Sequence, residues 1–321
     1  MLKRILAGLL ITAVALHWNG AMALTNQQHR ELQQAFDRSL QAFKVSLAGS
    51  ILSDREKLIF DSIKYDVRWF DGLIAHADIQ SGQRLVTIST GLIYILNNLK
   101  ATEIHSGLIP GDTCYFDYQK YIFLEIAKHN TAIGSFLAPD ELAGQYCVCQ
   151  SFSYANLSRS RWKLAVTNGL TLSTLFVVLH EAAHHIKGDV TQSAGYNVQV
   201  ELAADRWALE TASRAGFVLQ PATGAFGLLM ALEESAVAIP TEKSIRFDNL
   251  IATLVRELND KSLPRHLPSE AYDQAVKATL EYAEWARSIR SENVPVASKR
   301  CDRSPLSDYD DVPFTTMHGG R

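Results

Sequence analysis

The sequence predicts an α+β protein that is mainly α-helical and contains one small β-sheet. Helical periodicity fills most of the chain after Gly91, whereas alternating β-like patterns are confined to residues 65–88. One predicted helix, 168–187, is apolar around nearly its whole circumference, which is typical of a helix buried at the centre of a fold. These observations together favour a helical body built around one central helix, with a sheet at its side.

Composition limits the class of protein. Of the 321 residues, 47% are hydrophobic and 20% are charged, which is ordinary for a globular protein with a sizeable core. The formal net charge is −3, from 31 basic and 34 acidic residues. A nucleic-acid-binding surface needs a basic excess or a basic patch, and the sequence indicates neither. We therefore expect no nucleic-acid partner.

Residues 1–23 have the features of a signal peptide. Lys3 and Arg4 give the segment a positively charged start, and an apolar run follows from Ile5 to Leu16. The sequence Ala21-Met22-Ala23 has the small-x-small pattern of a cleavage site. The mature chain is therefore expected to begin near Leu24.

Cleavage would leave the mature chain in the periplasm or outside the cell. An uncleaved membrane anchor is the alternative, but the apolar run is short for a bilayer span, and His17-Trp18-Asn19 follows it at once. Later in the chain, Leu170–Leu179 is interrupted by polar residues and is too short to span a bilayer. We therefore expect no stable membrane span in the mature chain, which divides into one domain, 24–295, and a polar C-terminal tail, 296–321.

The predicted elements follow from the local period of apolar residues. Strands are expected at 65–70 and 84–88, in a sheet of two to four strands, and Ser53 is the expected N-cap of the second helix. Loops are expected at 105–116 and 134–160. Helices are expected over 26–46, 53–63, 91–99, 117–130, 168–187, 197–215, 222–237, 242–259 and 269–290.

Four cysteines follow the signal segment: Cys114, Cys147, Cys149 and Cys301. An even number of cysteines in an exported chain fits two disulfide bonds. Cys147 and Cys149 are too close in sequence to bridge each other comfortably, so each would pair with Cys114 or Cys301, and the sequence leaves the choice open. A cysteine-only zinc site is the alternative, but the chain lacks the paired C-x-x-C knuckles that such a site usually shows.

The helix 168–187 contains the pattern H-E-x-x-H, at His180, Glu181 and His184. Residues four apart lie on one face of a helix, one turn apart, so both histidines can direct a ring nitrogen at one metal ion. Glu181 lies about 100° around the helix from His180, where its carboxylate can reach a water on that metal. The pattern predicts one zinc ion per chain, with Glu181 as the catalytic base.

A third ligand is expected from the next helix. Glu201 and Asp205 are also four apart, and Ala203 and Ala204 between them are small enough for two helices to approach closely. Glu201 would complete a two-histidine, one-glutamate zinc site with an open position for water, while Asp205 would hydrogen-bond a histidine ligand, most simply His180. An ordinary solvated acidic face is the alternative interpretation of this pair.

These residues together resemble the gluzincin metallopeptidases, and most closely their M48 family, which includes the CAAX prenyl proteases. The segment 75–92 is similar to that family's strand before the active site, which lines the cleft and pairs with the substrate backbone. The segment 265–270 is similar to a downstream histidine-proline motif, and this similarity makes His266 a candidate catalytic residue that stabilises the transition state.

The resemblance implies a zincin-like fold with a central H-E-x-x-H helix, and an exported zinc-dependent endopeptidase that acts on proteins or peptides. Two alternatives remain: a zinc-binding, chaperone-like or inhibitory module that does not cleave, and a zinc amidohydrolase acting on an amide outside proteins. Glu181 favours a hydrolase, because a purely structural zinc site is usually closed by four protein ligands and does not use such a base.

Overall fold

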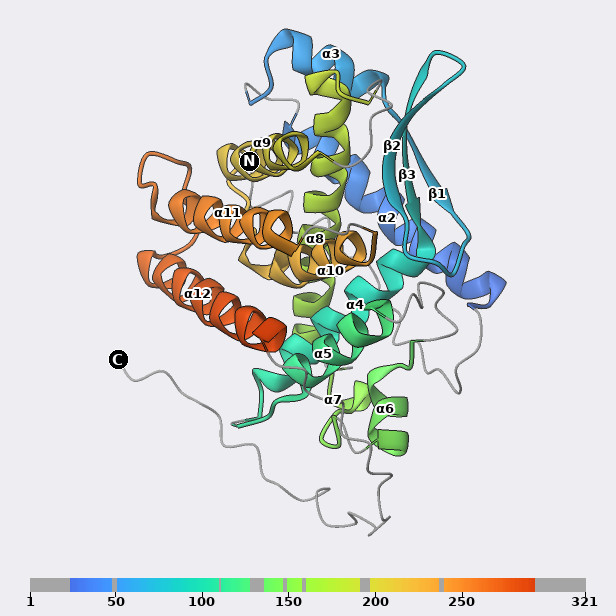
Figure 1. Cartoon of the computed structure of the whole chain (residues 1–321), viewed down its shortest axis with the longest axis vertical. Coiled ribbons are helices and arrows are strands. Elements are labelled where there is room, and N and C mark those ends of the chain that lie inside the picture. The colour runs from blue at the N-terminus through green and yellow to red at the C-terminus, as the bar shows by residue number, and fades with distance from the viewer. Residues whose placement is uncertain are drawn as a thin grey trace.

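The longest helix described, α8, runs through the middle of the fold, and most other elements pack around it (Figure 1). The computed structural model describes residues 24–47, 51–109, 111–127, 136–146, 149–157, 160–190, 197–236 and 240–291. In chain order the elements are α2 (Asn26–Leu47), α3 (Asp54–Ser62), β1 (Lys64–Arg68), β2 (Ala75–Gln80), β3 (Gln83–Ser89), α4 (Thr90–Ser106), α5 (Cys114–Ala127), α6 (Pro139–Tyr146), α7 (Tyr154–Leu157), α8 (Ser160–Lys187), α9 (Val198–Arg214), the 3-10 helix η2 (Gln220–Ala222), α10 (Thr223–Ala236), α11 (Pro240–Asn259) and α12 (Ser269–Ser291).

The strands among the described residues form one small sheet with the order β1-β3-β2. The central strand, β3, pairs in parallel with β1 and antiparallel with β2. Ser81 and Gly82 join β2 to β3, and both have positive φ angles (51° and 78°), as a two-residue type I′ turn requires. Most of β3 is buried, whereas the edge strand β2 is half-buried or exposed along its length. The prediction of a mainly helical α+β chain with a small sheet is confirmed.

The middle of α8 is buried on all sides, as the sequence predicts. Residues Leu175–Leu179, Ala182 and Ala183 are each at most 1% exposed. In Figure 1, α9, α11 and α12 form successive layers on one side of α8, and the sheet lies on the other. Ala204, Ala208 and Ala212, at four-residue intervals along α9, are completely buried and allow close helix packing. The start of α9 is thereby brought to the last turns of α8.

Several element boundaries match the sequence prediction closely. The predicted helices 26–46, 197–215, 222–237 and 269–290 correspond to α2, α9, α10 and α12, with ends that differ by no more than one residue. Ser53 caps α3 as expected: its hydroxyl accepts the amide of Glu56, and the Glu56 carboxylate accepts the amide of Ser53. This reciprocal pair is a capping box, which satisfies two of the free amides at the helix start.

Other boundaries correct the prediction. The loop expected at 134–160 contains α6 and α7, and α6 begins where the Glu141 side chain accepts the Ala138 amide at 2.7 Å. Helix α8 starts at Ser160 rather than 168, because Trp162 and Val166 extend its core-facing side by two further turns. Helix α4 continues to Ser106, so the loop expected from 105 is shorter.

Cys114 and Cys149 form a disulfide bond that joins the start of α5 to the segment before α7. This is one of the pairings that the sequence left open. Cys147 and Cys301 lie outside the described residues, as do the expected signal peptide, 1–23, and the C-terminal tail, 296–321.

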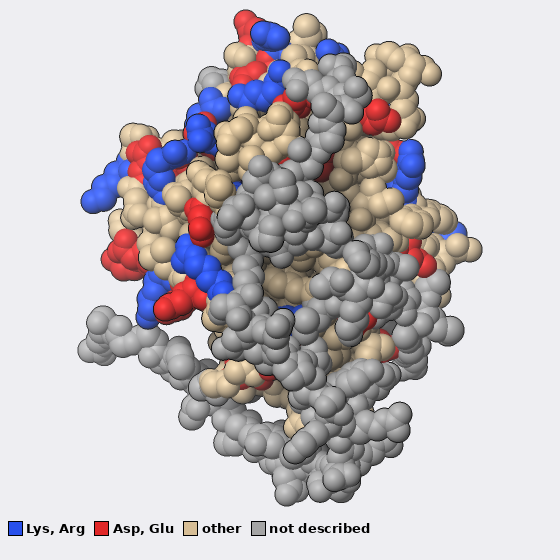
Figure 2. Space-filling view, in the orientation of Figure 1, with Lys and Arg blue, Asp and Glu red and all other residues tan. Residues whose placement is uncertain are grey.

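One segment in the described part of the chain, Trp162–Lys187, is long and apolar enough to cross a membrane by length and composition. The sequence prediction found no such stretch, because it considered only Leu170–Leu179, which is too short. Most of this segment is buried in the core as α8. On the face seen in Figure 2, much of the described surface carries no charged side chain, and along its left side Lys and Arg are mixed with Asp and Glu.

Candidate metal centre

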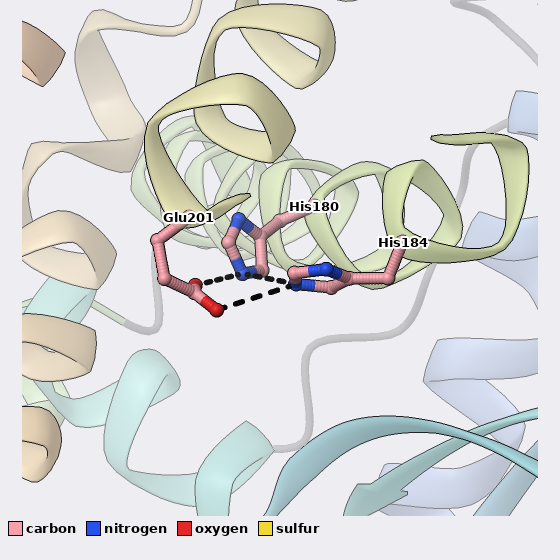
Figure 3. Close-up of side chains that lie close together, drawn as sticks. All are labelled: His180, His184 and Glu201. Atoms are coloured by element: carbon pink, nitrogen blue, oxygen red, sulfur yellow. Dashed lines mark hydrogen bonds and ion pairs between the residues drawn. The ribbon is translucent and has the colours of Figure 1, made fainter. Parts of the chain in front are cut away.

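The last turns of α8 carry the two histidines of the predicted site. His180 and His184 lie one turn apart on the same face, and their Nε2 atoms are 3.3 Å apart (Figure 3). His180 is 4% exposed, and its ring lies against the buried ring of Phe176 one turn earlier. Packing against Phe176 holds the buried ring of His180, and the Nε2 atoms of the two imidazoles converge on one point.

Helix α9 brings Glu201 to the same point. Asn197 caps this helix: its side-chain oxygen accepts the amide of Gln199 at 3.0 Å, so the helix starts at Val198 and Glu201 lies in its first turn. The two carboxylate oxygens of Glu201 lie 3.2 Å from His180 Nε2 and 3.8 Å from His184 Nε2. His180, His184 and Glu201 thus form a group that can hold a metal ion, as the sequence predicted.

The spacing of the two histidine nitrogens fits a tetrahedral ion. Zinc lies about 2.0–2.1 Å from histidine nitrogen, so two nitrogens at tetrahedral angles are separated by about 3.3–3.4 Å. Here the two histidine nitrogens are 3.3 Å apart, while one Glu201 oxygen lies 3.2 Å from His180 Nε2 and the other lies 3.8 Å from His184 Nε2. Without a metal, two converging imidazole nitrogens and a carboxylate would repel one another unless protons lay between them. One divalent ion would bind all three groups at once.

A carboxylate holds the far nitrogen of each histidine. Asp205 Oδ1 is 2.8 Å from His180 Nδ1, and Asp189 Oδ1 is 3.0 Å from His184 Nδ1. Asp189 follows Gly188 (φ 81°) in the turn that ends α8, where its amide donates to the His184 carbonyl at 3.1 Å. Each carboxylate fixes the tautomer that leaves Nε2 free for a metal.

Arg246, from α11, is the remaining charged group at this centre, and it is 1% exposed. Its guanidinium donates to both oxygens of Asp205, at 2.6 and 2.8 Å, and lies 3.1 Å from Glu201 Oε2. Its Nη2 is 3.5 Å from His180 Nε2. Arg246 therefore offsets the negative charge of the buried Asp205 and the half-buried Glu201, and it fixes their positions relative to α8.

Electrostatics at the centre follow from burial and from these pairs. Burial would lower the pKa of His180, but the carboxylates of Asp205 and Glu201 outweigh it and raise that pKa to about 10. Burial would raise the pKa of Glu201, but His180, Arg246 and His184 lower it to about 2. The pKa of Asp205 is likewise lowered to about 2, because Arg246 and His180 overcome the effect of burial. Both carboxylates are therefore ionised at neutral pH.

Glu181 is buried beside the group, with 6% of its surface exposed. Burial raises its pKa, while the charges of His180 and His184 act in the opposite direction. A carboxylate with a raised pKa, next to two converging imidazoles, is suited to accepting and returning a proton.

Two further histidines lie away from the group. His185 points to the sheet, where its Nε2 lies 2.9 Å from the Leu85 carbonyl oxygen, as expected for a residue that is not a ligand. His266 lies against Gly216, just beyond the C-terminal end of α9, whereas Glu201 lies near its start. Fifteen helical residues correspond to about 22 Å, so the structure does not bring His266 to the metal group. The family-based expectation for His266 is corrected on this geometry.

Sequence reasoning missed two members of the centre. Asp189 is not among the predicted site residues, although an acid directly after the glycine that ends a histidine-bearing helix lies within reach of the last histidine. Arg246 carries no local signal, because it reaches the centre only through the docking of α11 on α9.

Comparison of the chain with protein-family models, with curated protein sequences and with solved structures gives no match. The geometry of the metal centre therefore carries the functional argument.

Proposed function

We propose that this chain is an exported, zinc-dependent endopeptidase with His180, His184 and Glu201 as metal ligands and Glu181 as catalytic base. The observation that carries the proposal is the convergence of two Nε2 atoms and a carboxylate at the spacing of a tetrahedral ion. Each histidine is also oriented by a carboxylate on Nδ1. The described residues offer three ligands at this centre, which is the number found in catalytic rather than structural zinc sites.

Each residue of the centre has a chemical task in this proposal. A zinc ion held there would polarise a substrate carbonyl and lower the pKa of a water molecule. Glu181 takes a proton from the attacking water and passes it to the leaving amine, for which its buried position and raised pKa are suited. Asp205 and Asp189 keep the imidazoles in place, and Arg246 holds Glu201 and Asp205 through the reaction.

The sheet supports a peptide as substrate. Among the described strands, β2 is an edge strand that pairs on one side only, and it packs against α8, the helix of the metal centre. An edge strand offers free backbone donors and acceptors, to which an extended peptide can add as a further strand. This would place a substrate backbone beside the last turns of α8, in the manner that the M48 resemblance implies.

Export is supported by the disulfide bond between Cys114 and Cys149. Structural disulfides persist in oxidising compartments such as the periplasm and the cell exterior, and are rare in the cytosol. The signal-peptide pattern of residues 1–23 is the second support.

The test is Glu181→Gln in the purified mature protein. The amide has the shape of the carboxylate but cannot take a proton, so we expect about one zinc per chain to be retained while cleavage of an unfolded exported protein is lost. Glu281→Gln, an exposed position on α12, is the matched control and should change neither property.

Each outcome discriminates between the candidate functions. Cleavage by the Glu181→Gln variant would contradict the assigned base. A wild type that binds zinc but cleaves no protein would favour the zinc-binding module, or an amidohydrolase if small amides are hydrolysed. A wild type that neither binds zinc nor gains activity on zinc addition would overturn the proposal.

A further inference from the structure

Leu24, where the signal-peptide pattern predicts the new N-terminus, is buried in the fold. Leu24 is 6% exposed and belongs to the main hydrophobic core. Thr25 and Gln28 form a reciprocal cap at the start of α2: the Thr25 amide donates to Gln28 Oε1 at 2.6 Å, and the Gln28 amide donates to Thr25 Oγ1 at 3.3 Å. The position of Leu24 is therefore fixed by its own side chain and by the helix that follows.

The nitrogen of Leu24 faces a carboxylate far away in sequence. It lies 3.4 Å from Asp71 Oδ1, in the connection between β1 and β2. The same oxygen lies 3.5 Å from His29 Nε2, and the other ring nitrogen of His29 is 2.7 Å from Thr90 Oγ1. Burial lowers the pKa of His29, which favours its neutral form, so the Asp71 carboxylate lacks a full positive charge from that side.

We infer that removal of the leader at Ala23–Leu24 creates an ammonium group that Asp71 binds, so that processing completes an ion pair within the folded protein. This inference rests on the export part of the proposed function. Hydrolysis breaks the Ala23–Leu24 amide: the water oxygen joins the Ala23 carbonyl carbon, and the Leu24 nitrogen gains a hydrogen. A leader-cleaving peptidase and water are the co-reactants. The new α-amino group, with an ordinary pKa of about 7.7–8.0, takes up a further proton at neutral pH.

The ion pair would strengthen a junction that is already tightly built. The turn after β1 lies on the start of α4: the Gly91 amide donates to the Phe70 carbonyl at 3.0 Å, and Ser89 Oγ donates to the Gly72 carbonyl at 2.5 Å. Asp71 lies in this turn, and its side chain is 26% exposed. An ammonium donor makes a stronger hydrogen bond to a carboxylate than a peptide amide does. Processing would therefore strengthen the contact between the start of α2 and the connection that leads into β2.

The first experiment identifies the processed end. The full chain is expressed with its own leader in an exporting host, and the exported protein is measured by intact mass and N-terminal sequencing. We expect Leu24 as the first residue. A different first residue, or a retained leader, would overturn the processing step.

The second experiment measures the ion pair by a double-mutant cycle on zinc-saturated protein. One chain begins at Leu24, and a longer one begins at Met22, which moves the ammonium away and leaves an amide at Leu24. Each is made with Asp71 and with Asp71→Asn, and the ratio of folded to unfolded protein is obtained from urea titrations. We expect the substitution to lower this ratio on the order of tenfold more in the Leu24 chain. Equal effects in both chains would overturn the pairing.

Matched controls keep this result interpretable. Asp61→Asn, an exposed position on α3, should have the same effect in both chains. If Asp71→Asn prevents folding, the stabilities of the two chains that keep Asp71 are compared directly. A Leu24 chain no more stable than the Met22 chain would then overturn the pairing. Neither experiment measures hydrolysis of a substrate, so a protein that passes both and is inactive as a peptidase contradicts only the proposed function. An active protein without the coupling contradicts only this inference.

Discussion

At the residue scale, Arg246 contacts most of the charged groups of the metal centre. Its guanidinium contacts Asp205 through two nitrogens and Glu201 through the third, all in a buried site. A planar guanidinium can serve both carboxylates at once, whereas an ammonium group acts as a single point charge. The position of Glu201 should therefore depend on the shape of this side chain as well as on its charge.

We expect Arg246→Lys to weaken zinc binding by about 10–100-fold, as is usual when a partner of the metal ligands is removed. Competition with a chromophoric chelator measures the affinity. Arg256→Lys, on the same helix and paired with the exposed side chain of Glu210, is the control and should leave the affinity unchanged. An equal loss in both variants would show that general destabilisation, and not the contact with Glu201, is responsible.

Zinc binding should also depend on pH through His180. Its pKa of about 10 in the metal-free protein means that a proton occupies the imidazole at neutral pH and competes with the metal. The affinity should therefore rise about tenfold per pH unit between pH 6 and 9, with release of about one proton per zinc from this residue. Calorimetry in buffers of different ionisation enthalpy counts the proton, and a pH-independent affinity would contradict the expectation.

The sequence predicts the part of the centre that helix geometry determines. His180, Glu181 and His184 follow from spacing along one helix, and Glu201 and Asp205 follow from the same spacing on the next. Arg246 could not be found in this way, because its role depends on a contact between α9 and α11. His266 was expected from family likeness alone, and such likeness gives no distance in the fold.

At the element scale, the junction between the sheet and α4 depends on a missing side chain. A Cβ on Gly91 would lie 2.5 Å from the carbonyl oxygens of both Asp71 and Gly72, which are backbone atoms that cannot rotate away. A Cβ on Gly144, in α6, would meet no atom within 4 Å. A side chain at position 91 would therefore clash with the backbone, whereas one at position 144 has free space.

We expect Gly91→Ala to destabilise the protein by about 1–3 kcal/mol, because the turn after β1 must move away from α4. Gly144→Ala should instead be neutral or stabilise by up to about 1 kcal/mol, since alanine favours a helix over glycine. Urea unfolding of both variants gives the comparison. A Gly91→Ala variant as stable as Gly144→Ala would contradict the close contact between α4 and the turn after β1.

Element boundaries were predictable where a cap or a clear period marks them. Ser53 and Glu56 form the capping box that marks the start of α3, and Asn197 is the N-cap that marks the start of α9. The start of α8 was missed because polar residues separate Trp162 and Val166 from the apolar run, although both side chains pack on the core. Helix α6 was missed because the Pro139-Asp140-Glu141 start signal was outweighed by the surrounding loop-like composition.

At the scale of the whole molecule, one covalent link ties distant segments together. The disulfide bond between Cys114 and Cys149 closes a loop with a sequence separation of 35. Both residues are buried. Cys114 is the first residue of α5 and Cys149 lies before α7, whereas the metal group is formed by α8 and α9. Its pairing could not be predicted, since four cysteines allow several connectivities.

We expect the double substitution Cys114→Ala/Cys149→Ala to lower stability by about 3–4 kcal/mol, from the entropy that the open loop restores to the unfolded chain. Zinc content should remain about one per chain, because the ligands lie on α8 and α9. Urea unfolding and elemental analysis measure the two properties. Loss of zinc together with the bridge would show that the two sites are coupled.

Helix α8 has a consequence for the chain before it folds. The segment Trp162–Lys187 has the length and apolar character of a bilayer-crossing helix, and the protein core hides it only after α4, α9 and the sheet have assembled around it. During synthesis, and during the export that we propose, the lipid and the unfinished core would therefore compete for the same residues. His180, Glu181 and His184 near the end of this segment make it costly to leave in hydrocarbon, so the residues proposed for chemistry would also bias the nascent chain towards release and folding.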